Sequence, residues 1–208
     1  MFGLSKIELI ILKKLSTPIK IQNFLDAMPI NWEHKGETYM SVRRILREKK
    51  MHCLEGAFLA AAALYLKGEK PLLMDLKTDG SDDDHVVALY KRNNHWGAIS
   101  KTNHATLRFR DPIYKTLREL AVSYFHEYFN NHTGKKVLVS YSKPFNLKKF
   151  GTKWIIANED LFDIMEAIDD SKHLKIFPKK NAKFIRRADK MEKKAGRLIE
   201  WKKINPRT

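Results

Sequence analysis

The chain has 208 residues, of which 43% are hydrophobic and 31% are charged, and its formal net charge is +16. This length and apolar content predict one folded domain, with room for an appendage, and exclude a disordered or low-complexity chain. A single cysteine excludes an internal disulfide. Without a long apolar run or a signal-peptide pattern, the sequence predicts a cytoplasmic protein with no membrane partner.

The N-terminal quarter is predicted to be helical. A helix is expected over 4–15, and Pro18 is well placed in the first turn of a second helix that continues through 19–25. Ser41 is a suitable N-cap for a third helix over 42–47. An alanine-rich apolar helix then begins at the only cysteine, Cys53, and reaches residue 66.

The middle of the chain is predicted to form antiparallel strands. Short apolar runs favour strands over 72–76, 86–90, 96–100, 105–110 and 137–142. Asn93 and Asn94 form a suitable two-residue turn between the second and third runs. In that register His85 faces Thr102 and lies near Ser100, with Asn103 just beyond.

The C-terminal part is predicted to return to helices, over 117–129, 160–167 and 182–201. Residues 171–208 carry 14 Lys and Arg against 3 Asp and Glu, so they account for +11 of the net charge of +16 and leave +5 for the rest. Such a Lys/Arg-rich tail suits contact with nucleic acid or an acidic partner. A solvated basic helix is the simpler interpretation, because no aromatic stacking array accompanies the charge. The order of elements predicts an α+β fold.

Cys53 is a candidate nucleophile. A helix N-terminus carries partial positive charge, which lowers the pKa of a thiol placed there. A thiol at a helix start followed by a histidine at a strand start, here His85, is the order of a Cys-His catalytic pair. The alternatives are a small buried cysteine and a loop-edge histidine that pairs with one of the aspartates 82–84.

These segments resemble the transglutaminase-like superfamily, whose core is similar to that of papain-like cysteine peptidases. The resemblance rests on C-x-x-G-A-x-L-x-A-A from Cys53, the G-x-x-P break at 68–71, the D-H-V-V-A-L run at 84–89 and Trp96, and it covers roughly 17–111. It implies a transglutaminase-like domain over 1–145, in which the nucleophile helix packs on an antiparallel sheet. Residues 146–208 are then a helical, basic C-terminal extension.

The third residue of the site departs from the family pattern. The family has an aspartate about four positions after the tryptophan, where this chain has Ser100. Asn103 is the first choice for the residue that orients His85, because an asparagine fills this role in papain-like enzymes. Asp111, which precedes a proline, is the second choice and Ser100 the third.

The resemblance implies acyl transfer on a peptide, protein or amide substrate. Cys53 would attack a carbonyl while His85 takes and returns the proton. The backbone N–H of Cys53 and the side chain of Gln22 would bind the oxyanion, and Trp96 would wall the cleft. Water as acceptor gives a peptidase or amidase, and an amine gives a transglutaminase. The competing class is an inert binding module of the same fold that docks through its basic tail.

No cofactor or metal is predicted. The aspartates 82–84 lack the alternate spacing of a calcium loop, and a single cysteine provides no Cys/His metal-ligand pattern. These aspartates are expected to form a solvated loop or a clamp on a cationic substrate beside His85.

Overall fold

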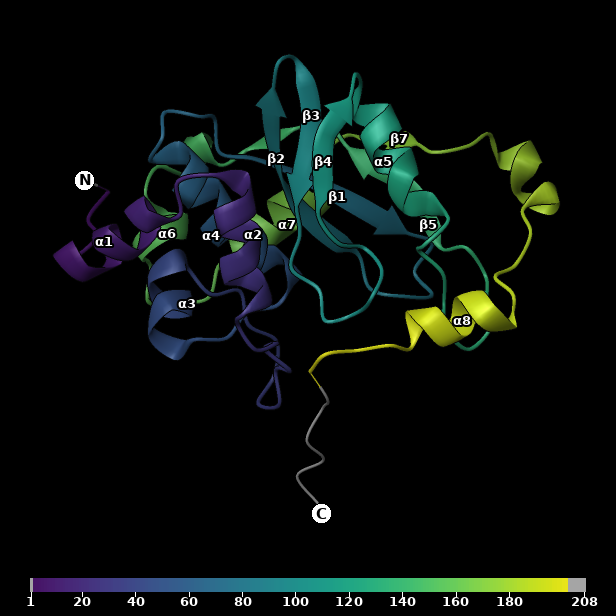
Figure 1. Ribbon diagram of the computed structural model, residues 1–208, viewed down its shortest axis with the longest axis horizontal. Coiled ribbons are helices and arrows are strands. Elements are labelled where there is room, and N and C mark those ends of the chain that lie inside the picture. The colour runs from purple at the N-terminus through teal and green to yellow at the C-terminus, as the bar shows by residue number, and fades with distance from the viewer. Residues whose placement is uncertain (1, 202–208) are drawn as a thin grey trace.

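A computed structural model describes residues 2–201, which form one antiparallel sheet with helices on both faces (Figure 1). The strand order is β4-β3-β2-β1-β5-β7, and β6 pairs with β1 beside β5. The strands are β1 Leu72–Thr78, β2 His85–Arg92, β3 His95–Ile99, β4 Arg110–Tyr114, β5 Leu138–Ser142, β6 Phe145–Asn146 and β7 His173–Lys175. The predicted α+β class is confirmed.

The helices lie unequally on the two faces of the sheet. The α-helices are α1 Lys6–Lys14, α2 Pro18–Asp26, α3 Val42–Glu48, α4 Cys53–Tyr65, α5 Leu117–Phe125, α6 Lys153–Ile156, α7 Phe162–Asp169 and α8 Lys190–Gly196, with short 3-10 helices at Leu147–Phe150 and Lys179–Phe184. Figure 1 shows the purple and blue N-terminal helices on one side of the sheet and α5 on the other. Within residues 2–201, none of the helices combines the length and apolarity needed to span a bilayer.

The first four helices are predicted correctly because local signals fix their ends. The Thr17 hydroxyl accepts a hydrogen bond from the Lys20 N–H at the start of α2, and Ser41 accepts one from the Arg44 N–H at the start of α3. Side-chain oxygens at these N-cap positions satisfy N–H groups that have no partner inside the helix. The caps therefore set the entry to each helix from the sequence alone.

Helix α4 is the centre of the larger core. Every residue from Leu54 to Leu64 is buried, and the helix packs mainly on β2. Its run of alanines keeps the side chains short, so the helix lies close to the strands. Trp154 of α6 and Ile21 of α2 complete this core, whereas Tyr124 of α5 packs into a second core on the opposite face of the sheet. The small residues of α4 thus bring Cys53 close to the sheet.

The β2–β3 hairpin has the predicted turn. Asn93 and Asn94 both adopt positive φ, 47° and 62°, as a two-residue hairpin turn requires. The predicted partners Leu89 and Ala98 face each other, but the ladder ends one pair later, at Ala88 and Ile99. The expected ladder pairing of His85 with Thr102 does not form, because the chain leaves β2 after Ile99 and turns toward α2.

The strand expected over 105–110 is wrong. The chain there is irregular, and β4 begins only at Arg110, where the predicted strand ends, and runs through Asp111 and Pro112. Proline is tolerated because β4 is an edge strand that pairs only with β3, so the missing N–H removes no second ladder bond.

The helix predicted over 160–167 is found as α7, shifted by two residues, whereas the other two predicted C-terminal helices are too long. Helix α5 ends at Phe125 rather than 129, and within 182–201 only Lys190–Gly196 is α-helical. Asp189 caps α8 by accepting from the Glu192 N–H, and this reciprocal capping box starts the helix eight residues later than expected. Strand β6 crosses the proposed boundary at 145 and pairs with β1, and β7, beyond it, pairs with β5 of the same sheet.

Candidate active site

Cys53 is the first residue of α4 and lies between two pockets. One pocket has a volume of about 350 Å³ and the other about 250 Å³, and Cys53 and His52 line both. The residue is half-buried, and its Sγ lies 4.0 Å from the carbonyl oxygen of Asp84. A thiol in this position is surrounded by protein yet open to a ligand in either pocket.

Two imidazoles lie near the Cys53 thiol, because His52 and His85 line one pocket with it. Burial of the thiol opposes its ionisation, but hydrogen bonds and charge from His52 and His85 more than offset this and hold the pKa of Cys53 well below its ordinary value. The site therefore favours the thiolate, the nucleophilic form of cysteine, more than water would.

His52 is the contact that the sequence analysis did not predict. Side chains of adjacent helical residues diverge, but His52 is the N-cap residue, with extended backbone angles, so its ring is free to turn toward Cys53. Its Nε2–H donates to the Thr38 carbonyl at 2.8 Å. Burial lowers the pKa of His52, yet its hydrogen bond to Cys53 and the charge of Glu55 raise that pKa to about 9.

The carboxylate of Glu55 fixes the position of His52. Its fully buried carboxylate accepts hydrogen bonds from the His52 backbone N–H at 2.9 Å, the Met40 N–H at 3.0 Å and the Thr38 hydroxyl at 3.1 Å. Burial raises the pKa of Glu55, and the His52 charge and these donors oppose that rise. Because Thr38 also binds the His52 ring, one carboxylate holds both the ring and its acceptor.

His85 is oriented by Ser100. The ring Nε2 lies 2.8 Å from the Ser100 Oγ, and the Ser100 hydroxyl donates to the carbonyl oxygen of Leu107 at 2.5 Å. With its only hydrogen on Leu107, the hydroxyl has to accept, so His85 carries its proton on Nε2 and leaves Nδ1 as a proton acceptor. Among the three residues considered for this role, the structure brings Ser100, the third choice, onto the ring.

Gln22 does not face the thiol as an oxyanion donor would. Its Nε2 donates to the Ser100 carbonyl at 2.8 Å and to Asp26, and its Oε1 accepts from the Ser100 N–H at 3.0 Å. These bonds use both ends of the amide. Gln22 is a positioning residue that joins α2 to Ser100, and through Ser100 to His85.

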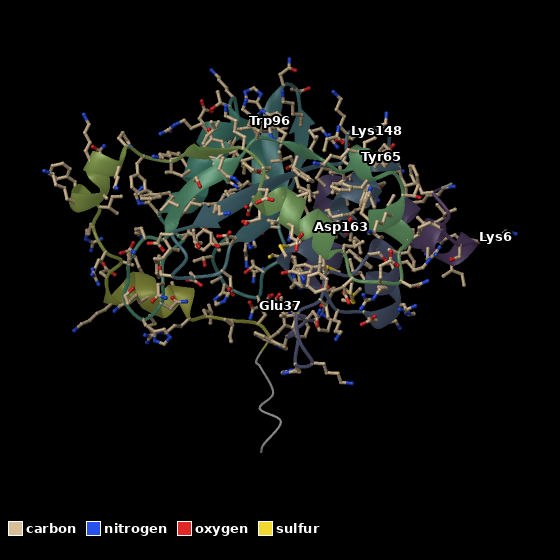
Figure 2. The ribbon with its side chains drawn as sticks, turned by 180° about the vertical axis from the view of Figure 1, so that it is seen from behind. Lys6, Glu37, Tyr65, Trp96, Lys148 and Asp163 are labelled. Carbon is tan, nitrogen blue, oxygen red and sulfur yellow. The ribbon has the colours of Figure 1, made fainter. Side chains whose placement is uncertain are left out.

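The other predicted site residues lie further out. Asn103 lines the smaller pocket, but its carbonyl accepts from the Glu200 N–H and its Nδ2 contacts the Trp201 carbonyl at 3.4 Å, so the C-terminal segment holds it. Asp111 is exposed on β4. Trp96 lies at the far end of the molecule from Glu37, which lines the larger pocket, and Lys91 covers its ring (Figure 2). Neither Asp111 nor Trp96 lines a pocket that contains Cys53.

Lys101 anchors the segment that carries Ser100. Its side chain is buried beside Gly56, where a Cβ would overlap it, and its Nζ donates to the carbonyls of Leu25 at 2.8 Å and Met28. Burial lowers the pKa of Lys101 from its ordinary value of 10.5 to about 8. The charged form is thus less favourable in the folded protein than in the unfolded chain.

A pH effect on stability follows for Lys101. Between its folded pKa of about 8 and its unfolded pKa of 10.5 the unfolded chain binds more protons, so stability contributed by this group rises with pH. Relative to Lys101→Met, the wild type should gain about 3 kcal/mol in free energy of unfolding across this range. Urea titrations from about pH 7 to pH 11 measure it, and parallel curves for the two proteins would contradict it.

The larger pocket is strongly acidic, and we call it the acidic pocket. Among the described residues no Lys or Arg lines it, although the chain as a whole has a net charge of +16. Its carboxylates come from the loop before α3, from β1, from the segment before β2 and from the end of α7: Glu33, Glu37, Asp75, Asp83, Asp84 and Asp169. Of the aspartates 82–84, Asp83 and Asp84 line this pocket, whereas Asp82 lines only the smaller one.

The arrangement provides a nucleophile, a proton acceptor and a binding cavity. The thiol of Cys53, the free Nδ1 of His85 and the acidic pocket meet at the start of α4. No protein-family model matches the chain, and no curated protein matches it, so the chemistry of these side chains is the basis for assigning a function.

Proposed function

We propose that the protein is a cysteine-dependent acyl-transfer enzyme of the peptidase, amidase or transglutaminase type. The observation that carries the proposal is the position of Cys53, a half-buried thiol at a helix N-terminus that lines one pocket together with His52 and His85. Reactive cysteines occupy such electropositive, partly exposed positions, whereas structural buried cysteines are inert.

The fold supports a transglutaminase-like assignment. A nucleophile helix, α4, packs on β2 of an antiparallel sheet, and the histidine stands at the start of that strand. This is the arrangement expected for the core that transglutaminase-like and papain-like enzymes share. The main departure from the family is the third residue, which is Ser100 and not an acid. The Ser100 hydroxyl orients His85 but adds no negative charge beside it.

The proposed reaction begins with transfer of the thiol proton to His85 Nδ1, while the His52 cation stabilises the thiolate. Sulfur attacks the carbonyl carbon of an amide, and the oxyanion accepts a hydrogen bond from the Cys53 N–H, which has no acceptor elsewhere in residues 2–201. The C–N bond then breaks, and His85 gives its proton to the leaving amine. Water or a second amine attacks the thioester, His85 removes its proton, and the thiol leaves as the new acid or amide forms.

The test combines thiol reactivity with acyl transfer. Wild-type Cys53 should react with iodoacetamide at a rate that is already on its plateau near pH 7, and His85→Ala should be at least about tenfold slower at that pH. With p-nitrophenyl acetate, the wild type should release one burst of nitrophenol and carry an acetyl group on Cys53. Cys53→Ser should show neither.

The outcome that contradicts the proposal is a rate that rises only around the ordinary thiol pKa of about 8.5 in both proteins. In that case the inert binding module remains, with the basic C-terminal segment as its docking surface. Its own signature would be affinity for nucleic acid that falls steeply with salt concentration.

A further inference from the structure

The acidic pocket contains a buried carboxylate oxygen without a partner. Asp75 lies on β1 at 2% exposure, and its Oδ2 is 3.0 Å from the His173 Nε2. Its Oδ1 is buried and forms no hydrogen bond within the described part of the chain. An unsatisfied buried carboxylate oxygen is unfavourable, so its retention at the wall of a ligand-sized pocket points to a donor that arrives with the ligand.

Other carboxylates surround the same space. Asp75, Asp84 and Asp169 each offer an oxygen within 4.8 Å of the others. Lys77 pairs with Asp169, His173 with Asp75, and His52 lies 3.9 Å from Glu33. Over residues 2–201, Glu37, Asp83 and Asp84 form no ion pair, so the pocket keeps an excess of negative charge.

The rest of the wall is apolar. Leu54, Val86, Met165 and Ile168 line the pocket together with the carboxylates, in a volume of about 350 Å³. A bare Ca²⁺ or Mg²⁺ ion binds through oxygen ligands, which apolar walls do not supply, and it needs far less space. A lysine or arginine side chain has an aliphatic stem that packs on apolar walls and a terminal cation that pairs with carboxylates. The lining therefore favours an organic cation over a metal.

We propose that the acidic pocket binds the cationic side chain of the acyl substrate, so that the enzyme acts on peptides with a lysine or arginine beside the scissile amide. This inference rests on the proposed function, because Cys53 lines the same pocket and defines where the scissile carbonyl lies. The cation donates to Asp75 Oδ1 at the base, while Asp83, Asp84 and Glu37 attract it from the rim.

Two affinity labels test the pocket directly. N-acetyl-lysine chloromethyl ketone and N-acetyl-norleucine chloromethyl ketone have the same stem and the same reactive group and differ in the terminal ammonium. The lysine label should alkylate wild-type Cys53 at least about tenfold faster, with saturation at high label concentration. Asp75→Asn, which keeps the side-chain shape, should bring the two rates within about threefold. The matched control Asp163→Asn, on the outer face of α7, should keep the wild-type ratio (Figure 2).

A second variant, which we call the rim variant, keeps the test decisive if Asp75→Asn fails to fold. The double variant Glu37→Gln and Asp83→Asn changes side chains that form no ion pair in the described residues, and it should also lower the ratio of the two rates. Equal rates for both labels in the wild type would overturn the inference. A high ratio that persists in Asp75→Asn and in the rim variant would also overturn it, because general surface charge would then explain the preference.

Two further measurements separate the remaining explanations. Calorimetric binding of Ca²⁺ or Mg²⁺ alone, lost in Asp75→Asn and accompanied by equal label rates, would assign the pocket to a metal instead. Iodoacetamide, which has no charge, reports the thiol itself. Fast alkylation by iodoacetamide with equal label rates rejects the pocket and keeps the acyl-transfer function, whereas slow alkylation by iodoacetamide rejects the function.

Discussion

Glu55→Ala is expected to lower the free energy of unfolding by about 3–5 kcal/mol, because it removes a buried charged acceptor from several donors at once. The Met40 and His52 N–H groups and the Asn31 amide would lose this partner in a place that water reaches poorly. The same change should slow alkylation of Cys53 near neutral pH, since the His52 ring and its acceptor Thr38 would no longer be fixed.

Glu119→Ala is the matched control for Glu55→Ala. Glu119 occupies the same third position of a helix, in the capping box of α5, but it is exposed and its carboxylate accepts from the N–H groups of Lys115 and Thr116. Its loss should cost about 1 kcal/mol, as expected for an exposed cap. Urea unfolding of the two variants compares them. A similarly small loss of unfolding free energy in Glu55→Ala would show that the hydrogen bonds to the buried Glu55 carboxylate do not stabilise the fold as expected.

The elements near the site were predictable where short-range signals fix them. The caps at Thr17 and Ser41 define α2 and α3, and the Asn93-Asn94 turn defines the β2–β3 register as far as Ile99. Past Ile99 the hairpin rule no longer applies, because long-range hydrogen bonds from Gln22 direct the chain away from β2. The hairpin register had placed Ser100 near His85, and the preference for Asn103 came from the resemblance to papain-like enzymes, in which an asparagine fills this role.

The second imidazole was missed for a related reason. Helix geometry separates adjacent side chains, and this rule does not apply to an N-cap residue such as His52. The signal that could have found it is Glu55, which stands three residues after His52 and so marks a capping box. The hydrogen-bond donors of Glu55 could not be predicted in this way. Asn31 and Met40 reach this buried carboxylate only because a loop distant in sequence folds onto α4.

His52→Gln is expected to raise the pKa of Cys53 and to slow its alkylation at least about tenfold near pH 6, because less of the thiol is then ionised. The imidazolium of His52, whose pKa is raised to about 9, provides the positive charge closest in sequence to the thiolate. Glutamine keeps a polar group beside the Thr38 carbonyl but carries no charge. Above about pH 9 the two proteins should react at similar rates, because both thiols are ionised there.

Loss of His52 should remove a charge that stabilises the thiolate, whereas loss of His85 should remove the group that moves the proton. His52→Gln shifts the pH profile of alkylation, and its acyl burst should return when the pH is raised, because His85 still moves the proton. In His85→Ala the turnover that follows the burst should stay slow at every pH, because no imidazole is left beside Ser100 to take the proton of the attacking water. His132→Gln, in an exposed loop, is the control and should match the wild type. If the His52→Gln profile superimposes on that of the wild type, His85 alone ionises the thiol, and the charge on His52 serves only to hold the loop that contains Thr38.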